Sequence, residues 1–173
     1  EIFLVHRVTK IGLVTRLVSH KGLDLIKGIL DELLYTTDVQ VAVLGSGDWQ
    51  YENFFREMQA KYPDKLAVTI GFIPALARKI YAGADLFLMP SKSEPCGLSQ
   101  MIASRYGCVP IVRETGGLKD SIKDFGCLEG GNGYTFTNYK VDDLVYSIKR
   151  AIKDFYDKDS WKEKIKTVMQ VDF

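Results

Sequence analysis

Val41-Ala-Val-Leu44 and Leu86-Phe-Leu-Met89 are short apolar runs that contain no polar residue, and they are the strongest indication of the fold class. A strand with both faces buried has this composition, because helices cover both sides of a parallel sheet. Similar runs occur along the chain, and we expect strands over residues 11–15, 39–44, 66–70, 86–89, 109–112 and 134–136.

Helical patterns separate the expected strands. They cover residues 22–35, 49–61, 76–81, 98–106, 141–155 and 160–169. Regular alternation of strand and helix predicts an α/β fold. We therefore expect one domain over residues 1–173, a Rossmann-like doubly wound parallel sheet of about six strands with helices on both faces.

Composition limits the function. The chain has 173 residues, 46% of them hydrophobic, which is enough for an ordinary core. A net charge of +1 argues against nucleic-acid or membrane-surface binding, which needs a basic excess. No apolar stretch approaches the ~20 residues that span a bilayer, and residues 1–10 do not resemble a signal peptide.

Three cysteines, Cys96, Cys108 and Cys127, match no zinc-ligand spacing. We expect them to be reduced core residues of a cytoplasmic protein (plastid if it comes from a plant). No Asp-x-Asp pair follows a strand, and His and Cys form no cluster with metal-ligand spacing. The sequence therefore predicts no metal and no cofactor.

Ligands of doubly wound folds bind beyond the carboxyl ends of the strands. Arg16 and Lys21 follow the first strand and flank a loop that leads into a helix. Both side chains suit phosphate oxygens, Arg as a fork and Lys as a point charge. The alternative is a pair of solvated cations beside a turn.

Gly45-Ser-Gly-Asp48 follows the second strand. Gly45 and Gly47 would let a backbone approach a ligand closely. The dinucleotide-binding fingerprint would need glycine where Gln50 stands, so that interpretation is weak. The alternative is a tight turn capped by Asp48.

The segment after the fourth strand is the most informative. Glu94 lies between Pro90 and Pro95-Cys96-Gly97-Leu98-Ser99, and proline stiffens such a loop. Glu94 could hold sugar hydroxyls, and the backbone near Gly97 could hold a diphosphate. A loop rich in helix-capping residues is the alternative.

Two further segments reach the same edge. Tyr81, on the helix after the third strand, could stack on a planar base or pack in the core. Thr115 and Gly116, in the loop after the fifth strand, could line the same cleft or form a plain turn.

These residues resemble a known family, the bacterial glycogen synthases and plant starch synthases. The resemblance extends from about residue 11 to residue 173, and the Glu-Pro-Cys-Gly-Leu and Thr-Gly-Gly-Leu motifs are highly specific. The matching stretches are Val14-Thr-Arg-Leu-Val-Ser-His-Lys-Gly-Leu-Asp-Leu25, Leu44-Gly-Ser-Gly-Asp48, Ile80-Tyr-Ala-Gly-Ala-Asp85, Met89-Pro-Ser-Lys-Ser-Glu-Pro-Cys-Gly-Leu98, Arg105-Tyr-Gly107 and Pro110-Ile-Val-Arg-Glu-Thr-Gly-Gly-Leu118.

The resemblance implies the C-terminal, donor-binding half of a retaining glycosyltransferase of the GT-B class, which has two Rossmann-like halves. The expected enzyme is a hexosyltransferase that moves glucose from ADP-glucose or UDP-glucose to the non-reducing end of an α-1,4-glucan. Arg16 and Lys21 would hold the diphosphate, Tyr81 would stack on the base, and Glu94 would contact the glucose. The backbone at Cys96, Gly97 and Leu98 would bind phosphate or sugar oxygens.

The family places further catalytic groups in an N-terminal half, which we expect to be absent from this chain and to be its partner domain. The isolated chain is therefore expected to be inactive. Two alternatives remain open. One is the donor domain of a different GT-B transferase, and the other is a non-catalytic nucleotide-binding α/β module. The choice between ADP and UDP rests on the resemblance alone.

Overall fold

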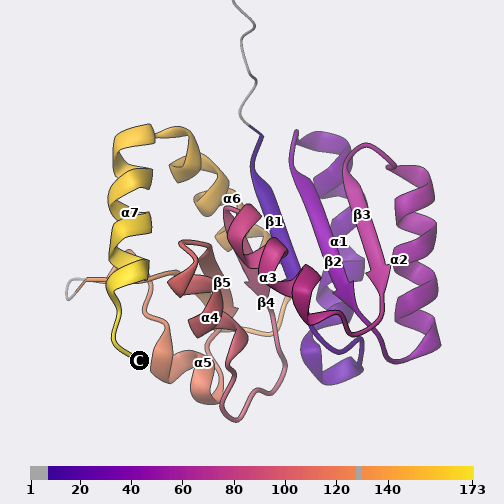
Figure 1. Cartoon of the computed structure of the whole chain (residues 1–173), viewed down its shortest axis with the longest axis horizontal. Coiled ribbons are helices and arrows are strands. Elements are labelled where there is room, and N and C mark those ends of the chain that lie inside the picture. The colour runs from indigo at the N-terminus through magenta and orange to yellow at the C-terminus, as the bar shows by residue number, and fades with distance from the viewer. Residues whose placement is uncertain (1–7, 128–129) are drawn as a thin grey trace, which may run out of the picture.

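The computed structural model describes residues 8–127 and 130–173, and in this part of the chain strands and helices alternate as expected. Figure 1 shows the arrangement. The elements are β1 (Lys10–Val14), a 3-10 turn η1 (Ser19–Lys21), α1 (Leu23–Thr36), β2 (Gln40–Gly45), α2 (Trp49–Lys61), β3 (Leu66–Ile70), α3 (Pro74–Gly83), β4 (Leu86–Met89), α4 (Ser99–Arg105), β5 (Val109–Arg113), α5 (Gly116–Ser121), β6 (Tyr134–Phe136), α6 (Val141–Tyr156) and α7 (Lys158–Gln170).

The six strands form one parallel sheet in the order β3-β2-β1-β4-β5-β6. The predicted doubly wound α/β fold is therefore confirmed. The order reverses between β1 and β4, so the chain leaves these two strands for helices on opposite faces of the sheet, and ligands of such folds bind at the carboxyl edge beside this reversal. Residues after β1 and β4 are the ones best placed to bind a ligand.

A core lies on each face of the sheet, as the apolar runs predict. Along β4, Leu86 and Leu88 join the core beneath α1, α2 and α6, whereas Phe87 and Met89 join the core beneath α3, α4 and α5. Both helical layers flank the sheet in Figure 1. Every helix of the described residues is too short or too polar to cross a membrane.

One predicted loop is a helix. Gly116–Ser121 forms α5, although its two glycines predicted a loop that either lines the cleft or forms a plain turn. Leu118 anchors the helix because its side chain is fully buried against Phe87 and Val112 in the smaller core. The apolar contact outweighs the low helix propensity of glycine.

Two other expectations are wrong. Asp48 occupies the N-cap position of α2, but its side chain makes no capping bond; Glu52 instead accepts a hydrogen bond of 3.0 Å from the Gly47 N–H. Of the three cysteines, only Cys108 is a core residue, since Cys96 and Cys127 are exposed. All three thiols are free, and burial raises the pKa of Cys108. Most of the segment that was compared with a signal peptide, residues 1–7, lies outside the described residues.

Candidate functional site

A lysine and a glutamate that are 73 residues apart meet at the carboxyl edge. Lys21 Nζ donates to Glu94 Oε2, and the two side chains are only 14% and 11% exposed. Ser91 Oγ lies 3.5 Å from the same carboxylate oxygen. The structure thus brings together two of the predicted site residues from the loops after β1 and β4.

Backbone contacts hold the Lys21 loop against the Glu94 loop, which we define as residues 90–98. The His20 carbonyl accepts from Lys92 N at 2.9 Å and from Ser93 N at 3.4 Å. Gly22 has φ 77°, and a Cβ there would lie 2.0 Å from the Pro90 carbonyl oxygen. Only glycine allows this close approach.

The loop after β5 closes on the Glu94 loop from the other side. Gly117 N donates to the carbonyls of Glu94 and Pro95 at 3.1 and 3.2 Å. A Cβ on Gly116 would lie 2.2 Å from the Glu94 carbonyl oxygen, and one on Gly117 would lie 1.9 Å from that of Cys96. The Thr-Gly-Gly sequence is thus explained by contact with the Glu94 loop. Thr115 itself is the N-cap of α5, and no ligand role follows from its protein contacts.

A second group of predicted residues lines a pocket of about 720 Å³ at the same edge. Arg16, Gly45, Tyr81 and Ser99 all contribute to it. We call it the aromatic pocket, because Phe72, Tyr81 and Tyr106 lie along its wall. It is lined by Val14, Thr15, Arg16, Leu44, Gly45, Ser46, Gly71, Phe72, Ile73, Pro74, Ala77, Arg78, Tyr81, Ser99, Ile102 and Tyr106.

Tyr81 serves the core as well as the pocket. Its side chain is 6% exposed, packs on Phe87 at a ring distance of 5.1 Å, and is stacked by Tyr106 at 6.2 Å. Burial raises the pKa of its hydroxyl, and a hydrogen bond with Ser99 partly offsets that effect. Little of the ring remains free, so the more exposed Tyr106 offers a broader face to an incoming base.

Residues 95–99 connect the two groups. The segment begins next to Glu94 and ends at Ser99, which lines the aromatic pocket. Gly97 has φ 73°, a left-handed conformation that favours glycine. The backbone N–H groups of Cys96, Gly97 and Leu98 donate to no protein oxygen among the residues described. These donors are therefore open to a ligand.

Gly47 does not join the site. It pairs with Leu17 in a parallel bridge beyond the end of β1, and a Cβ there would lie 2.4 Å from the Leu17 carbonyl oxygen. Its N–H is used by Glu52. The close approach that requires glycine at this position is to the protein's own backbone.

Some lining residues were not predicted from the sequence. Arg78 lies three positions before Tyr81 on α3, and Ile102 on α4 and Tyr106 at its C-cap follow the N-cap residue Leu98 at intervals of four. Helical spacing places such residues on one face. This helical spacing is the feature of the sequence from which these lining residues could have been predicted.

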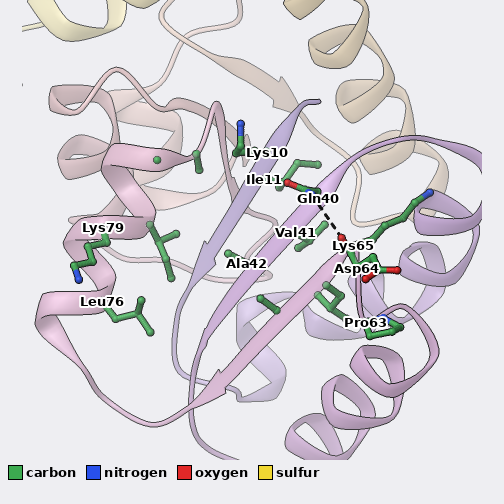
Figure 2. Close-up of a pocket in the computed structure, with 15 residues that line it drawn as sticks. Lys10, Ile11, Gln40, Val41, Ala42, Pro63, Asp64, Lys65, Leu76 and Lys79 are labelled. Carbon is green, nitrogen blue, oxygen red and sulfur yellow. Dashed lines mark hydrogen bonds between the residues drawn. The ribbon is translucent and has the colours of Figure 1, made fainter. Parts of the chain in front are cut away.

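A different pocket, of about 400 Å³, opens at the amino ends of β1, β2 and β3 (Figure 2). Its lining includes apolar residues such as Val41 on β2 and Leu76 on α3, together with Lys10, Lys65 and Lys79. It contains none of the predicted site residues. The carboxyl edge alone gathers them.

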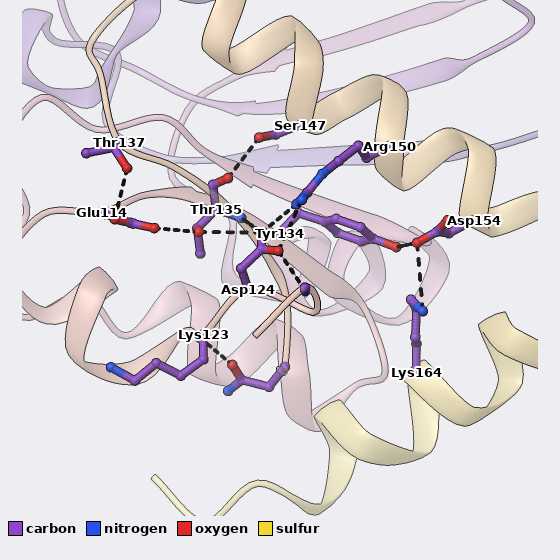
Figure 3. A network of polar contacts seen from close by, with 12 residues as sticks. Glu114, Lys123, Asp124, Tyr134, Thr135, Thr137, Ser147, Arg150, Asp154 and Lys164 are labelled. Carbon is purple, nitrogen blue, oxygen red and sulfur yellow. Dashed lines mark hydrogen bonds and ion pairs between the residues drawn. The ribbon is translucent and has the colours of Figure 1, made fainter. Parts of the chain in front are cut away.

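A polar network joins α6, β6 and the segment around Asp124 (Figure 3). Asp124 accepts hydrogen bonds from Arg150, from Thr135 N at 2.8 Å and from Gly126 N at 2.8 Å. Burial acts to raise the pKa of Asp124, but these hydrogen bonds outweigh it and the pKa is lowered.

The network reaches the loop after β5 through Glu114. Its carboxylate accepts hydrogen bonds from Thr135 Oγ1 at 2.7 Å and Thr137 Oγ1 at 3.0 Å. Glu114 directly precedes the Thr-Gly-Gly segment. The network therefore fixes the start of the loop that packs on Glu94.

Comparison with known proteins agrees with this geometry. The chain matches the family described as glycosyl transferases group 1 over residues 4–168. It is 52% identical over 163 residues to a glycogen synthase of Desulforamulus reducens, which covers 94% of this chain and 34% of that protein. It is 49% identical over 167 residues to a glycogen synthase of Geobacillus thermodenitrificans, covering 96% of this chain and 34% of that protein.

A solved structure is also similar: the catalytic domain of starch synthase IV from Arabidopsis thaliana, bound to ADP and acarbose. It superimposes with a TM-score of 0.89 at 35% identity, over 96% of this chain and 35% of that one. The chain spans about a third of the length of the curated relatives it matches. The similarity to glycogen and starch synthases expected from the motifs is confirmed, and the chain belongs to the glycosyl transferases group 1 family.

Proposed function

We propose that this chain is the C-terminal, donor-binding half of a glycogen or starch synthase. The whole enzyme would transfer glucose from ADP-glucose to the non-reducing end of an α-1,4-glucan with retention of configuration. The observation that carries the proposal is the convergence of Lys21, Glu94 and the aromatic pocket on one edge of the sheet.

The aromatic pocket would hold the nucleoside. Its size and its aromatic wall suit a base that stacks on rings. Arg16, on the rim, would then be close to the phosphates. ADP is favoured over UDP because the similar starch synthase IV structure contains ADP. A nucleotide bound in the aromatic pocket would have its base at Tyr81 and Tyr106 and its sugar directed towards Glu94.

Glu94 would bind hydroxyl groups of the transferred glucose. Its Oε2 is engaged by Lys21, whereas Oε1 has no hydrogen-bond partner within the described part of the chain. A carboxylate oxygen with unused lone pairs accepts hydrogen bonds from sugar hydroxyls. Lys21 would at the same time offer its remaining protons to the diphosphate.

The leaving diphosphate would be stabilised without a metal. Lys21, which is held by Glu94, and the free N–H groups of residues 96–98 would act as preorganised donors, joined by the exposed Arg16, and such donors stabilise charge that develops as a bond breaks. The departing phosphate would help to deprotonate the acceptor hydroxyl. The N-terminal half would supply the acceptor site, so we expect the isolated chain to bind donor nucleotide but not to transfer glucose.

Calorimetry with ADP tests the proposal. The unmodified chain should bind ADP weakly, and the affinity should fall with added salt because phosphate contacts dominate. Lys21→Ala should weaken binding by about tenfold, the loss expected for one charge-assisted hydrogen bond. A folded sample that binds neither ADP nor ADP-glucose would contradict the proposal.

Lys61→Ala is the matched control. Lys61 pairs with Asp31 at 2.6 Å on the surface between α1 and α2, away from the carboxyl edge. Its removal should leave ADP affinity unchanged. Equal losses in the Lys21 and Lys61 variants would show that ADP responds to overall charge, as expected for a binding module without this site.

A further inference from the structure

Gln100 is a polar side chain in the first turn of α4 and is completely buried. Burial of an amide without hydrogen bonds is costly, so its partners are informative. Nε2 donates to the Gly97 carbonyl at 3.1 Å and to Ser121 Oγ at 3.0 Å. Gln100 therefore connects the Glu94 loop to α5.

The hydrogen bonds continue from α5 back to Glu94. Ser121 Oγ donates to the Gly117 carbonyl at 2.6 Å. Gly117 N in turn donates to the Glu94 and Pro95 carbonyls. A closed circuit thus runs from Gln100 through Ser121 and Gly117 to Glu94 and Pro95 in the middle of the Glu94 loop, and from Gln100 directly to Gly97 near its end.

The bond to Gly97 fixes the direction of one peptide group. The Gly97 carbonyl and the Leu98 N–H belong to the same planar trans peptide, so they point in opposite directions. Because the carbonyl is held towards the buried Gln100 amide, the Leu98 N–H is directed away from it. Leu98 is 64% exposed, and its N–H has no acceptor among the residues described.

The shape of the loop depends on the same contact. Gly97 has φ 73°, and a Cβ there would lie 2.7 Å from Gln100 Oε1. The glutamine amide therefore fills the space that a side chain at position 97 would need. Gln100 and Gly97 act as a pair that keeps this peptide in one orientation.

We propose that Gln100 is a positioning residue for donor binding, which holds the Gly97–Leu98 peptide so that the Leu98 N–H meets a phosphate or sugar oxygen. The inference rests on the proposed function, because it assigns a role within the same site. Gln100 itself does not touch the donor. Its effect on affinity passes through the backbone of the loop.

Two substitutions test this with ADP as the probe. Gln100→Leu keeps the volume but removes both donors, and we expect ADP affinity to fall by about tenfold. Gln100→Glu replaces the amide by a carboxyl group that can donate only when protonated. Relative to the unmodified chain, this variant should bind ADP better at pH 5.5 than at pH 8, because protonation restores one donor to Gly97 or Ser121.

Gln59→Leu is the control. Gln59 also ties two elements together through its amide, since its Oε1 accepts from Val68 N in β3, but it lies outside the site. It should lower the melting temperature without changing ADP affinity. Measuring melting temperature for all variants separates loss of fold from loss of positioning.

The outcomes are distinguishable. Failure of the unmodified chain to bind ADP would overturn the proposed function itself. If that chain binds but Gln100→Leu binds equally well, or if Gln59→Leu weakens binding as much, the positioning role is wrong. Should Gln100→Leu fail to fold, the Gln100→Glu variant decides: a pH profile parallel to that of the unmodified chain would overturn the inference.

Discussion

Two partly buried ion pairs, Arg150–Asp124 and Lys21–Glu94, differ in how fully the protein satisfies them. Asp124 accepts two hydrogen bonds from Arg150 and two from backbone N–H groups, so both of its oxygens are used. Glu94 is bonded through Oε2 only, by Lys21 and more distantly by Ser91. Both oxygens of Asp124 accept hydrogen bonds from the protein, whereas Oε1 of Glu94 can still accept hydrogen bonds from a ligand.

This difference distinguishes an ion pair that stabilises the fold from an ion pair that can bind a ligand. The pair between α6 and the segment before β6 fixes the fold, because both oxygens of Asp124 already have hydrogen-bond partners, although the buried Arg150 Nε has none among the described residues. A pair with an unused oxygen at the mouth of a crevice can exchange or add partners when a ligand arrives. The following predictions test whether the two ion pairs differ in this way, beginning with the largest expected effect on stability.

Replacing the Arg150–Asp124 pair should lower the free energy of unfolding more than any other change. In the double variant Asp124→Leu, Arg150→Leu, the partly buried N–H of Thr135 loses its acceptor, which costs roughly 1–3 kcal/mol, and the hydrogen bonds of Arg150 are lost as well, whereas the exposed Gly126 N–H can bind water. We expect the free energy of unfolding in urea to fall by about 3 kcal/mol. A change below about 1 kcal/mol would show that the network of Figure 3 is dispensable.

Disturbing the close contact between Gly117 and the Glu94 loop should have the second-largest effect on stability. Gly117→Ala would force a Cβ to within 1.9 Å of the Cys96 carbonyl oxygen, so the loop must move. We expect a loss of about 2 kcal/mol in unfolding free energy, together with weaker ADP binding. Chemical denaturation and calorimetry on the same samples provide both values.

Gly83→Ala is the control for this substitution. Gly83 ends α3, and a Cβ there would have no neighbour within 4 Å. Alanine should stabilise the helix by roughly 0.5 kcal/mol. If both alanine variants changed stability alike, the close contact at Gly117 would not be the cause.

Acid should weaken the structural pair. The pKa of Asp124 is lower in the folded chain than the unfolded value of about 3.9, so its contribution is fully present above that value and is lost as pH falls through the folded pKa. Urea unfolding of the unmodified chain and Asp124→Asn should therefore differ most near pH 7 and converge below about pH 4. A constant difference across this range would contradict the lowered pKa.

The functional pair should have the smallest effect on stability. Replacing both partners, as in Lys21→Met, Glu94→Gln, leaves no unpaired buried charge, and such replacements are often neutral. We expect the unfolding free energy to change by less than about 1 kcal/mol while ADP binding is lost. A loss as large as that of the Asp124 variant would make Lys21–Glu94 a structural pair as well.

The sequence predicted the sheet well, because its signals are local. The boundaries of β3, β4, β6 and α2 agree with the predicted ranges, since each is an uninterrupted apolar or periodic run. Helix α5 was missed because glycine residues at 116 and 117 indicate a turn, and burial of Leu118 depends on tertiary contacts.

The site was predicted in part for a related reason. Lys21 and Glu94 could be placed on one edge because each follows a strand of the same parallel sheet. Gly47 and Asp48 were misjudged because their neighbours, Leu17 and Glu52, are set by the extension of β1 and by the first turn of α2. The Gln100 circuit joins residues up to 21 positions apart through side chains, which no local pattern reveals.

The most direct test of the central claim is a structure of this chain with ADP. We expect adenine in the aromatic pocket beside Tyr106 and the diphosphate between Arg16 and the backbone of residues 96–98, within reach of Lys21. ADP bound instead in the pocket at the amino ends of the strands (Figure 2), or with its phosphates remote from Lys21 and Arg16, would contradict it.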